Sequence, residues 1–353
     1  MSVTRIVCPL SALLVAGALA TRAQQSLPAI SLPSHSMRLV VVVNTKSGLP
    51  VTNLTQQDFT LLDNKAPRTI TSFRIDSAVA GSARVIVLLD AVNMPYQALA
   101  FARQGVAKYF KSNEGLLPYP TTLAVLTDKG AQIANDFTTD GNALSDMLDH
   151  QQIGLREINR ASEWSGPDRL QICLTAFHQL RAFAENLPGR KIVLWISPGW
   201  PLVSGPRVDL TEHEEQQIFS DVVSLSNQLR QDDLTVYNIN PWGVGEPLER
   251  ADLYEAFLKA PNRPSDVELG DLSVQVLAVH SGGLAIESNS DVAGNIARCL
   301  NDLRSWYAIT FDPLPADKPN EYHHIDVKLA RRDLIVRTRD GYYANPRLFE
   351  PRR

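Results

Sequence analysis

The stretch RVIVLLDAVNMPY, residues 84–96, holds the side chains of this sequence that are best placed to do chemistry. An apolar run ends at Asp90, and a short loop containing Asn93 follows before a helical pattern begins. Carboxylate and amide oxygens suit hard divalent cations, and several ligand- and metal-binding α/β domains begin with a strand that ends in aspartate. The first question is therefore whether Asp90 still belongs to a binding site.

Other patterns that could support catalysis are incomplete. The segment HEEQQ, residues 213–217, lacks the second histidine of a zinc-protease helix, so His213 is expected to be a solvated residue in a first helical turn. His323 and His324 are neighbours in an expected strand, where one side chain faces inward and the other outward. The sequence contains no G-x-S-x-G elbow and no glycine-rich loop after residues 85–90. A carboxylate pair for glycoside hydrolysis stays open, although no spacing singles one out.

The elements that must position Asp90 alternate between strands and helices from residue 84 onward. Strands joined by crossover helices favour an α/β fold with a doubly wound, mostly parallel sheet. Thr211 and Glu214 form a capping box that starts one of the helices. The expected strands are 85–90, 121–127, 131–138, 191–197, 234–240 and 282–288, and the expected helices include 141–150, one from Asp168, one from Thr211 and 291–303.

Both ends of the mature chain are rich in alternating apolar and polar residues, which indicates β-strands. Three or so short strands cannot easily bury a core by themselves, so the N-terminal strands need partners elsewhere. We expect a β-sandwich built from both ends, with the α/β domain inserted into it. The expected segments are a signal peptide (1–23), a flexible leader (24–36), N-terminal strands (37–80), the α/β domain (81–305) and C-terminal strands (306–346).

The N-terminus has the features of a secretory signal peptide. Arg5 precedes the apolar run Ile6 to Ala20, and small residues suit cleavage after Ala20 or Ala23. The run is shorter than the ~20 residues of a membrane span, and no second run of that length follows. The sequence thus predicts a secreted or periplasmic protein without an integral membrane segment after cleavage; a membrane anchor is the alternative.

Composition narrows the possible partners. The formal net charge is -4, the pI is about 6.0, and no basic stripe is evident, so nucleic acid is not an expected partner. After processing only Cys173 and Cys299 remain, both in apolar helical contexts. We expect two buried thiols, with a single disulfide as the alternative.

Several motifs, in their order and spacing, resemble the VWFA-related family of secreted bacterial proteins, a divergent branch of the von Willebrand factor A domains. The resemblance covers nearly the whole mature chain. The matching segments are Leu54, Asp58 and Phe59 followed by Asp63 and Phe73, then VIVLLDAVN (85–93), DFTTDGNAL (136–144), LPGRKIVLWISPGWP (187–201) and RTRDGYYA (337–344).

The resemblance implies a place for a divalent cation, but this sequence has lost most of the ligands. A domains hold the cation through an Asp-x-Ser-x-Ser loop, a threonine loop and a third loop with aspartate. Here Asp90 is kept, Val92 and Met94 stand at the serine positions, and Pro198 stands near the third-loop aspartate. Valine and proline offer no side-chain oxygen, and a thioether suits Mg²⁺ poorly.

The second loop, near residues 165–170, has no threonine, and its Asp168 is better explained as a helix N-cap. We therefore expect no metal and no other cofactor. An incomplete Mg²⁺ site made of Asp90, Asn93 and water is the alternative. Without a cation, Asp90 should hydrogen-bond to nearby loop N–H groups, as buried acids must.

What remains is recognition through the loops at the carboxyl ends of the parallel strands, where open α/β sheets bind ligands. The family resemblance implies an adhesion-type, non-enzymatic protein that binds a protein or cell-envelope ligand. The alternatives are a periplasmic hydrolase that uses carboxylates in the same crevice and a structural envelope component. Trp200 and Trp242 could also pack beneath their own loops instead of facing a partner. The candidate binding residues are Asp90, Asn93, Met94, Tyr96, Trp200 and Trp242.

Overall fold

The structure is a computed structural model that describes residues 36–78, 83–150, 166–200, 210–242 and 254–346. The expected signal peptide and residues 24–35 of the expected leader lie outside these residues. All described elements belong to the unit His35–Arg353.

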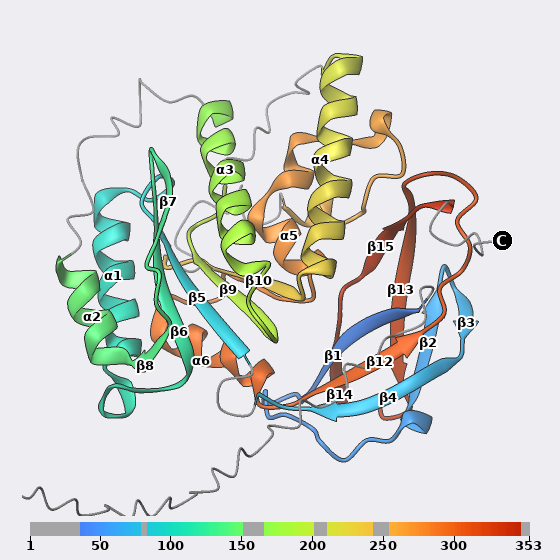
Figure 1. The fold of residues 1–353 in the computed structure, drawn as a ribbon, viewed down its shortest axis with the longest axis horizontal. Coiled ribbons are helices and arrows are strands. Elements are labelled where there is room, and N and C mark those ends of the chain that lie inside the picture. Colours follow the sequence, from blue (N-terminus) through green and yellow to red (C-terminus); the bar gives the residue numbers. More distant parts are fainter. Residues whose placement is uncertain (1–35, 79–82, 151–165, 201–209, 243–253, 347–353) are drawn as a thin grey trace, which may run out of the picture. The chain divides into compact units, whose positions relative to one another are not determined.

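A seven-stranded, mostly parallel sheet forms the centre of the α/β part (Figure 1). Its strands follow the order β11-β10-β9-β5-β6-β7, with β8 also paired to β6. The five strands from β11 to β6 are parallel, whereas β7 and β8 run antiparallel to β6. The strands are β5 (Ala83–Asp90), β6 (Leu116–Thr127), β7 (Gly130–Ile133), β8 (Thr138–Asp140), β9 (Arg190–Ile196), β10 (Leu234–Ile239) and β11 (Ala285–Ile286).

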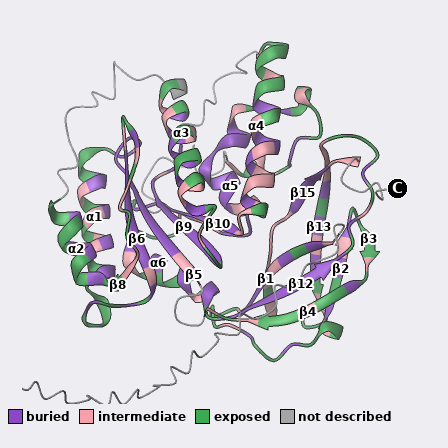
Figure 2. Ribbon diagram, in the orientation of Figure 1, coloured by how far each residue is buried: buried purple, intermediate pink, exposed green. Residues whose placement is uncertain are grey.

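Helices cover both faces of this sheet because its central strands are apolar on both sides. In β5, Val85, Val87 and Leu89 join one hydrophobic core with α1, α2 and α6, whereas Ile86 and Leu88 join another with α3, α4 and α5. Figure 2 shows the central strands buried between the helices. No described helix is long and apolar enough to cross a membrane. The helices are α1 (Tyr96–Phe110), α2 (Gly141–His150), α3 (Gly166–Ala184), α4 (Glu212–Gln231), α5 (Val274–His280) and α6 (Val292–Leu300).

Two four-stranded antiparallel sheets combine the two ends of the described chain. Their strand orders are β14-β1-β12-β4 and β15-β13-β2-β3, so strands from before and after the α/β part lie side by side in each sheet (Figure 1). A single hydrophobic core draws side chains from both sheets. The strands are β1 (Met37–Thr45), β2 (Phe59–Asp63), β3 (Ala66–Arg68), β4 (Ile70–Asp76), β12 (Trp306–Phe311), β13 (Glu321–Leu329), β14 (Leu334–Arg337) and β15 (Gly341–Ala344).

The expected α/β class with a mostly parallel sheet is confirmed, but some elements differ. Helix α3 begins at Gly166, two residues before the expected start, since Pro167 is tolerated in a first turn. The strand expected over 282–288 shrinks to β11, and Gly283 before it packs closely against β10, where an added Cβ would lie 1.7 Å from the Val236 carbonyl oxygen. The strand expected over 131–138 is split into β7 and β8, and Phe137 between them stacks on Phe183 of α3.

Several short elements had no sequence prediction. Among the described residues between β10 and β11, three 3-10 helices precede α5, and others follow β1 and α1. The 3-10 helix that follows α6 lies inside the helix expected over 291–303. The capping box of Thr211 and Glu214 is confirmed at the start of α4. The 3-10 helices are η1 (Gln56–Asp58), η2 (Ser112–Gly115), η4 (Tyr254–Phe257), η5 (Pro264–Asp266), η6 (Leu269–Leu272) and η7 (Asn301–Leu303).

The two cysteines are free and buried, as expected. Cys173 belongs to the core beneath α3 and α4, whereas Cys299 belongs to the core on the opposite face of the parallel sheet. The sheet itself therefore separates the two thiols, and the alternative of a disulfide between them is wrong.

A buried carboxylate connects the parallel sheet to the antiparallel strands. Asp302, 2% exposed, accepts hydrogen bonds from the Tyr237 hydroxyl of β10, the Arg337 guanidinium of β14 and, at 3.4 Å, the Asn44 amide of β1. Its backbone carbonyl accepts a hydrogen bond from Arg190 of β9 at 2.8 Å. Through Asp302, the short helix η7 is hydrogen-bonded to two strands of the parallel sheet, β9 and β10, and to two antiparallel strands, β1 and β14.

Replacement of Asp302 tests how much its carboxylate contributes to the stability of the fold. We expect Asp302→Ala to lower the free energy of unfolding by about 3–5 kcal/mol, because it leaves the mostly buried Arg337 cation without its partner. Denaturant titration of both proteins measures the difference. Asp312→Ala, which removes an exposed carboxylate, is the matched control and should change stability by less than about 0.5 kcal/mol. A loss of similar size in both variants would contradict the assigned role.

Candidate functional site at the carboxyl edge of the parallel sheet

The candidate site lies where the chain changes direction across the sheet. Strands β5 and β9 are neighbours, but β5 is followed in sequence by β6 on one side and β9 by β10 on the other. Connections that leave in opposite directions open a crevice beyond the carboxyl ends of the two strands, which is where open α/β sheets bind ligands. Asp90 ends β5 at this position, and Ser197 directly follows β9.

Asp90 is fully buried, and its carboxylate is surrounded by hydrogen-bond donors. Oδ1 accepts from the backbone N–H groups of Val92 (3.0 Å) and Asn93 (2.9 Å). Oδ2 accepts from the Asn93 amide (2.8 Å), the Trp195 indole (3.1 Å) and the Ser197 hydroxyl (2.9 Å). The expectation that Asp90 bonds to nearby loop N–H groups is confirmed. Five donors meet the roughly four lone-pair sites of a carboxylate, so its accepting capacity is filled.

The pKa of Asp90 reflects two opposing effects. Burial raises it above the usual value, whereas the hydrogen bonds from Asn93, Trp195 and Ser197 lower it. The net shift is upward, because transfer of a charge away from water is the larger effect. The side chain is therefore a polar group held inside the sheet edge and is not positioned as a solvent-exposed acid.

The loop after β9 keeps Ser197 in place. Two carbonyl groups, those of Trp195 and Ser197, accept hydrogen bonds from the buried Asn238 amide of β10. Gly199 has φ +118°, and an added Cβ would lie 2.0 Å from the Gln275 amide nitrogen. Only glycine fits this turn without strain, and its N–H donates to the Ser197 oxygen at 3.1 Å.

A buried thiol lies next to the carboxylate. The Asn93 amide donates both to Asp90 and to Cys173 Sγ, the latter at 3.1 Å. Burial and the nearby Asp90 charge raise the pKa of Cys173 well above its usual value, so the thiol stays protonated and unreactive near neutral pH. Asn93 Oδ1 is buried and has no hydrogen-bond partner among the described residues.

Besides Asp90 and Asn93, the four other candidate binding residues separate into two groups by exposure. Tyr96 and Trp242 are exposed, at 63% and 37%. Met94 and Trp200 are buried, at 0% and 3%, so the expectation that they present a surface at this edge is wrong. Trp200 packs against Trp195 with ring centroids 5.1 Å apart, which confirms for this residue the alternative that it packs beneath its own loop.

Sequence reasoning missed Trp195, Ser197 and Cys173 as neighbours of Asp90. The polar end of strand β9 was a usable signal, because parallel strands end at one edge and Ser197 follows its strand as Asp90 ends its own. Trp195 lies within an apolar strand, and Cys173 lies within an apolar helix stripe. Neither position differs in pattern from an ordinary core residue.

The three histidines singled out from the sequence do not belong to this edge. His213 is exposed in the first turn of α4, and His323 faces inward while His324 faces outward, as expected. His323 Nδ1 lies 3.0 Å from the buried Asp63 carboxylate, so it belongs to the core of the antiparallel sheets. Within the described ranges, no three His, Cys, Asp or Glu side chains are grouped so as to hold a metal ion.

A second cluster of titratable groups lines a small cavity beside α4 and α5. His280 Nδ1 lies 2.5 Å from Asp340, and Asp271, Tyr322 and Arg339 line the same cavity. Its volume of about 20 Å³ suffices for one water molecule. Burial raises the pKa of Asp271 to about 6, although the N–H of Glu268 donates to it. A sugar or peptide substrate does not fit this space.

Comparisons with known proteins leave the family open. No protein-family description matches the sequence, and no curated protein matches it. Among solved structures, the chain is similar to a point mutant of the PilB minor pilin from Streptococcus sanguinis, with 8% identity, a TM-score of 0.36, and coverage of 64% of this chain and 62% of the pilin.

A second solved structure, the human COPII-coat protein Sec24c, gives 8% identity and a TM-score of 0.31, over 77% of this chain and 46% of Sec24c. The chain thus spans less than two thirds of either protein. Likenesses this distant define neither the fold nor the activity of this chain.

The raised pKa of Asp271 predicts a pH effect on stability. The folded protein holds this proton more tightly than the unfolded chain, in which aspartate titrates near 3.9. The contribution of Asp271 to the free energy of unfolding therefore grows as the pH falls from about 7 to 4, and this contribution is lost as the pH rises through about 6.

Asp271→Asn should remove this dependence and stabilise the protein at pH 8 by about 2 kcal/mol, because asparagine still accepts from Glu268 and carries no charge. Urea titrations across pH 4–8 measure the difference between variant and native protein. Asp146→Asn, at an exposed position on α2, is the control. A difference that stays constant with pH would contradict the prediction.

Proposed function

We propose that this chain is an exported, non-enzymatic binding protein whose carboxyl sheet edge contacts a protein or cell-envelope ligand without a metal ion. The observation that carries the proposal is the state of Asp90. Its two oxygens accept five hydrogen bonds from the protein itself, at the position where a cation would need them. Donors of this kind replace a cation as the partner of a buried carboxylate.

Two aromatic side chains at the same edge support a binding role. Tyr96 begins α1 just beyond the carboxyl end of β5, and Trp242 follows the carboxyl end of β10. Because only β9 lies between β5 and β10, the ends of these strands are about 10 Å apart. Tyrosine and tryptophan are the residues that most often anchor protein interfaces, since they bury a large apolar area and keep a polar tip.

The strand order supports kinship with von Willebrand factor A domains. Numbered along the chain, β5, β6, β7, β9, β10 and β11 have the order 3-2-1-4-5-6 of a doubly wound sheet. The strands before and after this sheet pair with each other, which fits an α/β domain inserted into a β-sandwich. The apolar run Ile6 to Ala20, which lies outside the described residues, supports export.

The alternatives are distinguished by what surrounds the described carboxylates. For a periplasmic hydrolase, a crevice acid must be reachable by substrate, but Asp90 is fully buried and Asp271 lines a cavity with room for one water. A purely structural component would tolerate replacement of exposed aromatic residues at the edge. The binding experiment below therefore also tests that alternative.

The metal-free state is tested by thermal melting. We expect the melting midpoint to be unchanged by excess Mg²⁺ or Mn²⁺, because the Asp90 oxygens are already engaged. Asp90→Ala serves as the comparison, with its own metal-free midpoint as reference. A metal-dependent rise in the native protein that disappears in Asp90→Ala would overturn this part of the proposal.

Binding is tested by capture from a cell-envelope extract. We expect the double variant Tyr96→Ala, Trp242→Ala to capture less partner than the native protein, by a factor of about ten or more. Truncation of an aromatic anchor to alanine commonly lowers the binding free energy by about 2 kcal/mol or more. The matched control is Phe101→Ala, which removes another exposed aromatic ring on α1, 43% exposed. Equal recovery by the native protein and the double variant would refute the aromatic-edge proposal.

A further inference from the structure

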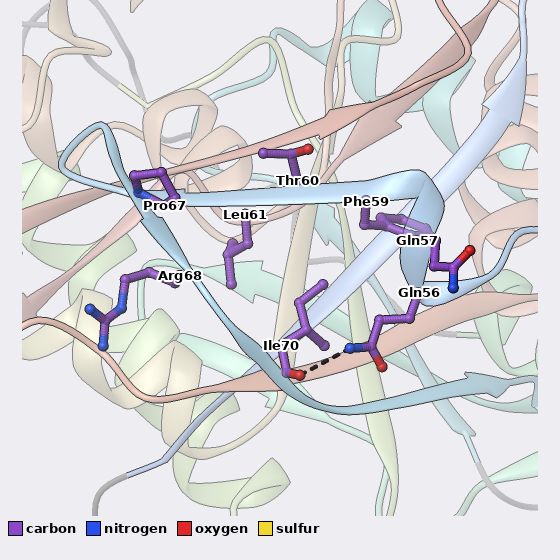
Figure 3. A pocket seen from close by; sticks show the side chains of 8 residues that line it. All are labelled: Gln56, Gln57, Phe59, Thr60, Leu61, Pro67, Arg68 and Ile70. Carbon is purple, nitrogen blue, oxygen red and sulfur yellow. Dashed lines mark hydrogen bonds between the residues drawn. The ribbon is translucent and has the colours of Figure 1, made fainter.

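An open groove lies between the two antiparallel sheets, away from the carboxyl edge. Its volume is about 500 Å³, within the range of ligand-binding clefts. Figure 3 shows Leu61 of β2 and Ile70 of β4 pointing into the space between their strands, where both side chains are buried in the core of the two sheets, at 1% and 8% exposed. Phe59 adds a third apolar side chain from the start of β2. The groove arises because the chain leaves one sheet after Arg68 and enters the other at Ile70.

Strand β4 lines the groove with its first residue, Ile70, and its unpaired edge continues from there. β4 is the last strand of its sheet, and its seven residues exceed the four of β14, the four of β15 and the three of β3, the other edge strands of the antiparallel sheets. Pro67 lacks an N–H and blunts the edge of β3, and α4 packs against β15 through a Phe219–Tyr343 ring contact. β4 is thus the longest of these edges and contains no proline.

A side-chain amide already occupies one backbone acceptor of this edge. Gln56 of η1 donates its Nε2–H to the Ile70 carbonyl at 3.1 Å, as the dashed line in Figure 3 marks. A neighbouring strand would supply the same kind of donor, a backbone N–H. The Ile70 carbonyl oxygen at this edge therefore accepts an amide N–H donor.

The charge of the groove further defines the occupant. Among the described residues that line it, Arg68 alone is charged. Its Nε and one terminal nitrogen donate to the Asp312 carbonyl, which fixes the guanidinium at the end of β3. The other terminal nitrogen has no partner among the described residues, and a carboxylate is its natural complement.

We propose that this groove binds an extended peptide segment of a partner protein that carries a carboxylate, by strand addition to β4. Backbone groups of the peptide pair with the β4 edge, and its carboxylate pairs with Arg68. Strand addition of this kind takes affinity from main-chain hydrogen bonds and specificity from pockets for alternate side chains. The site uses other elements than Tyr96 and Trp242, so it does not depend on the function proposed above.

The probes are fluorescein-labelled heptapeptides of alternating threonine and valine, one with a free C-terminal carboxylate, one amidated, and one amidated with an aspartate side chain at its end. Fluorescence anisotropy gives the affinity for the full mature chain. We expect both acidic probes to bind about two- to fivefold more tightly than the neutral amide, as an exposed ion pair allows. A probe with proline at alternate positions should not bind, because it lacks the N–H groups.

Two variants separate the contacts. Arg68→Gln should abolish the advantage of the acidic probes and leave the neutral amide unchanged, whereas Arg332→Gln, at an exposed position on another loop, should change neither. Gln56→Ala should tighten binding of all three probes by about two- to tenfold, because it removes the competing donor to Ile70. Unchanged melting midpoints verify that the variants are folded.

Hydrogen exchange identifies the bound strand. We expect slower exchange in Ile70–Asp76 with the acidic probe and no change in Leu334–Arg337, the opposite edge of the same sheet. The proposal would be overturned if no probe bound or if the proline probe bound equally well. It would also be overturned if the slowed exchange lay only in residues other than Ile70–Asp76. Preference for the free C-terminus over the aspartate side chain would identify the end of a partner chain as the source of the carboxylate.

Discussion

The pairing of the two ends of the chain is the constraint on which the other elements depend. β1 pairs with β12 and β2 pairs with β13, so residues more than 250 positions apart in sequence are hydrogen-bonded neighbours. Such pairs form only after the long intervening chain has been closed into a loop, and closure is entropically unfavourable. The Asp302 hydrogen bonds lie at the same junction and hold β10 against β14. The antiparallel sheets can therefore form only when the α/β part between their strands has brought both ends of the chain together.

The carboxyl edge of the parallel sheet illustrates how a buried acid is stabilised without a cation. A carboxylate removed from water needs partners for both oxygens, and Asp90 finds them in the loop that follows it and in two side chains of the β9 segment. The same hydrogen bonds fix the loop geometry, because Asn93 and Ser197 each bond to a further neighbour, Cys173 or Gly199. A rigid edge of this kind suits the presentation of exposed side chains.

The two proposed contact surfaces differ in the kind of partner that each favours. The carboxyl edge offers aromatic side chains on loops held by the parallel sheet, which suits a folded surface. The groove beside β4 offers backbone hydrogen bonds and one arginine, which suits an extended segment that carries a carboxylate. A protein with both surfaces could hold a folded ligand and a peptide tail at separate positions.

The sequence by itself determined the features that depend on local periodicity and local caps. Strand 85–90 was readable from its apolar run, the start of α4 from Thr211 and Glu214, and the opposite directions of His323 and His324 from strand alternation. The class of the fold followed from the alternation of strands and helices. These signals arise between residues a few positions apart, so one chain segment contains all the information they need.

Only the tertiary structure decided which of the candidate residues share a site. Trp195 donates to Asp90 from a position 105 residues away, and Cys173 accepts from Asn93 across 80 residues, yet both have the sequence patterns of ordinary core residues. Burial of Met94 and Trp200 depends on how distant helices and strands pack around them, which no local pattern encodes. Contacts between distant segments are set by packing and by the hydrogen bonds that burial demands, and these exist only once the chain is folded.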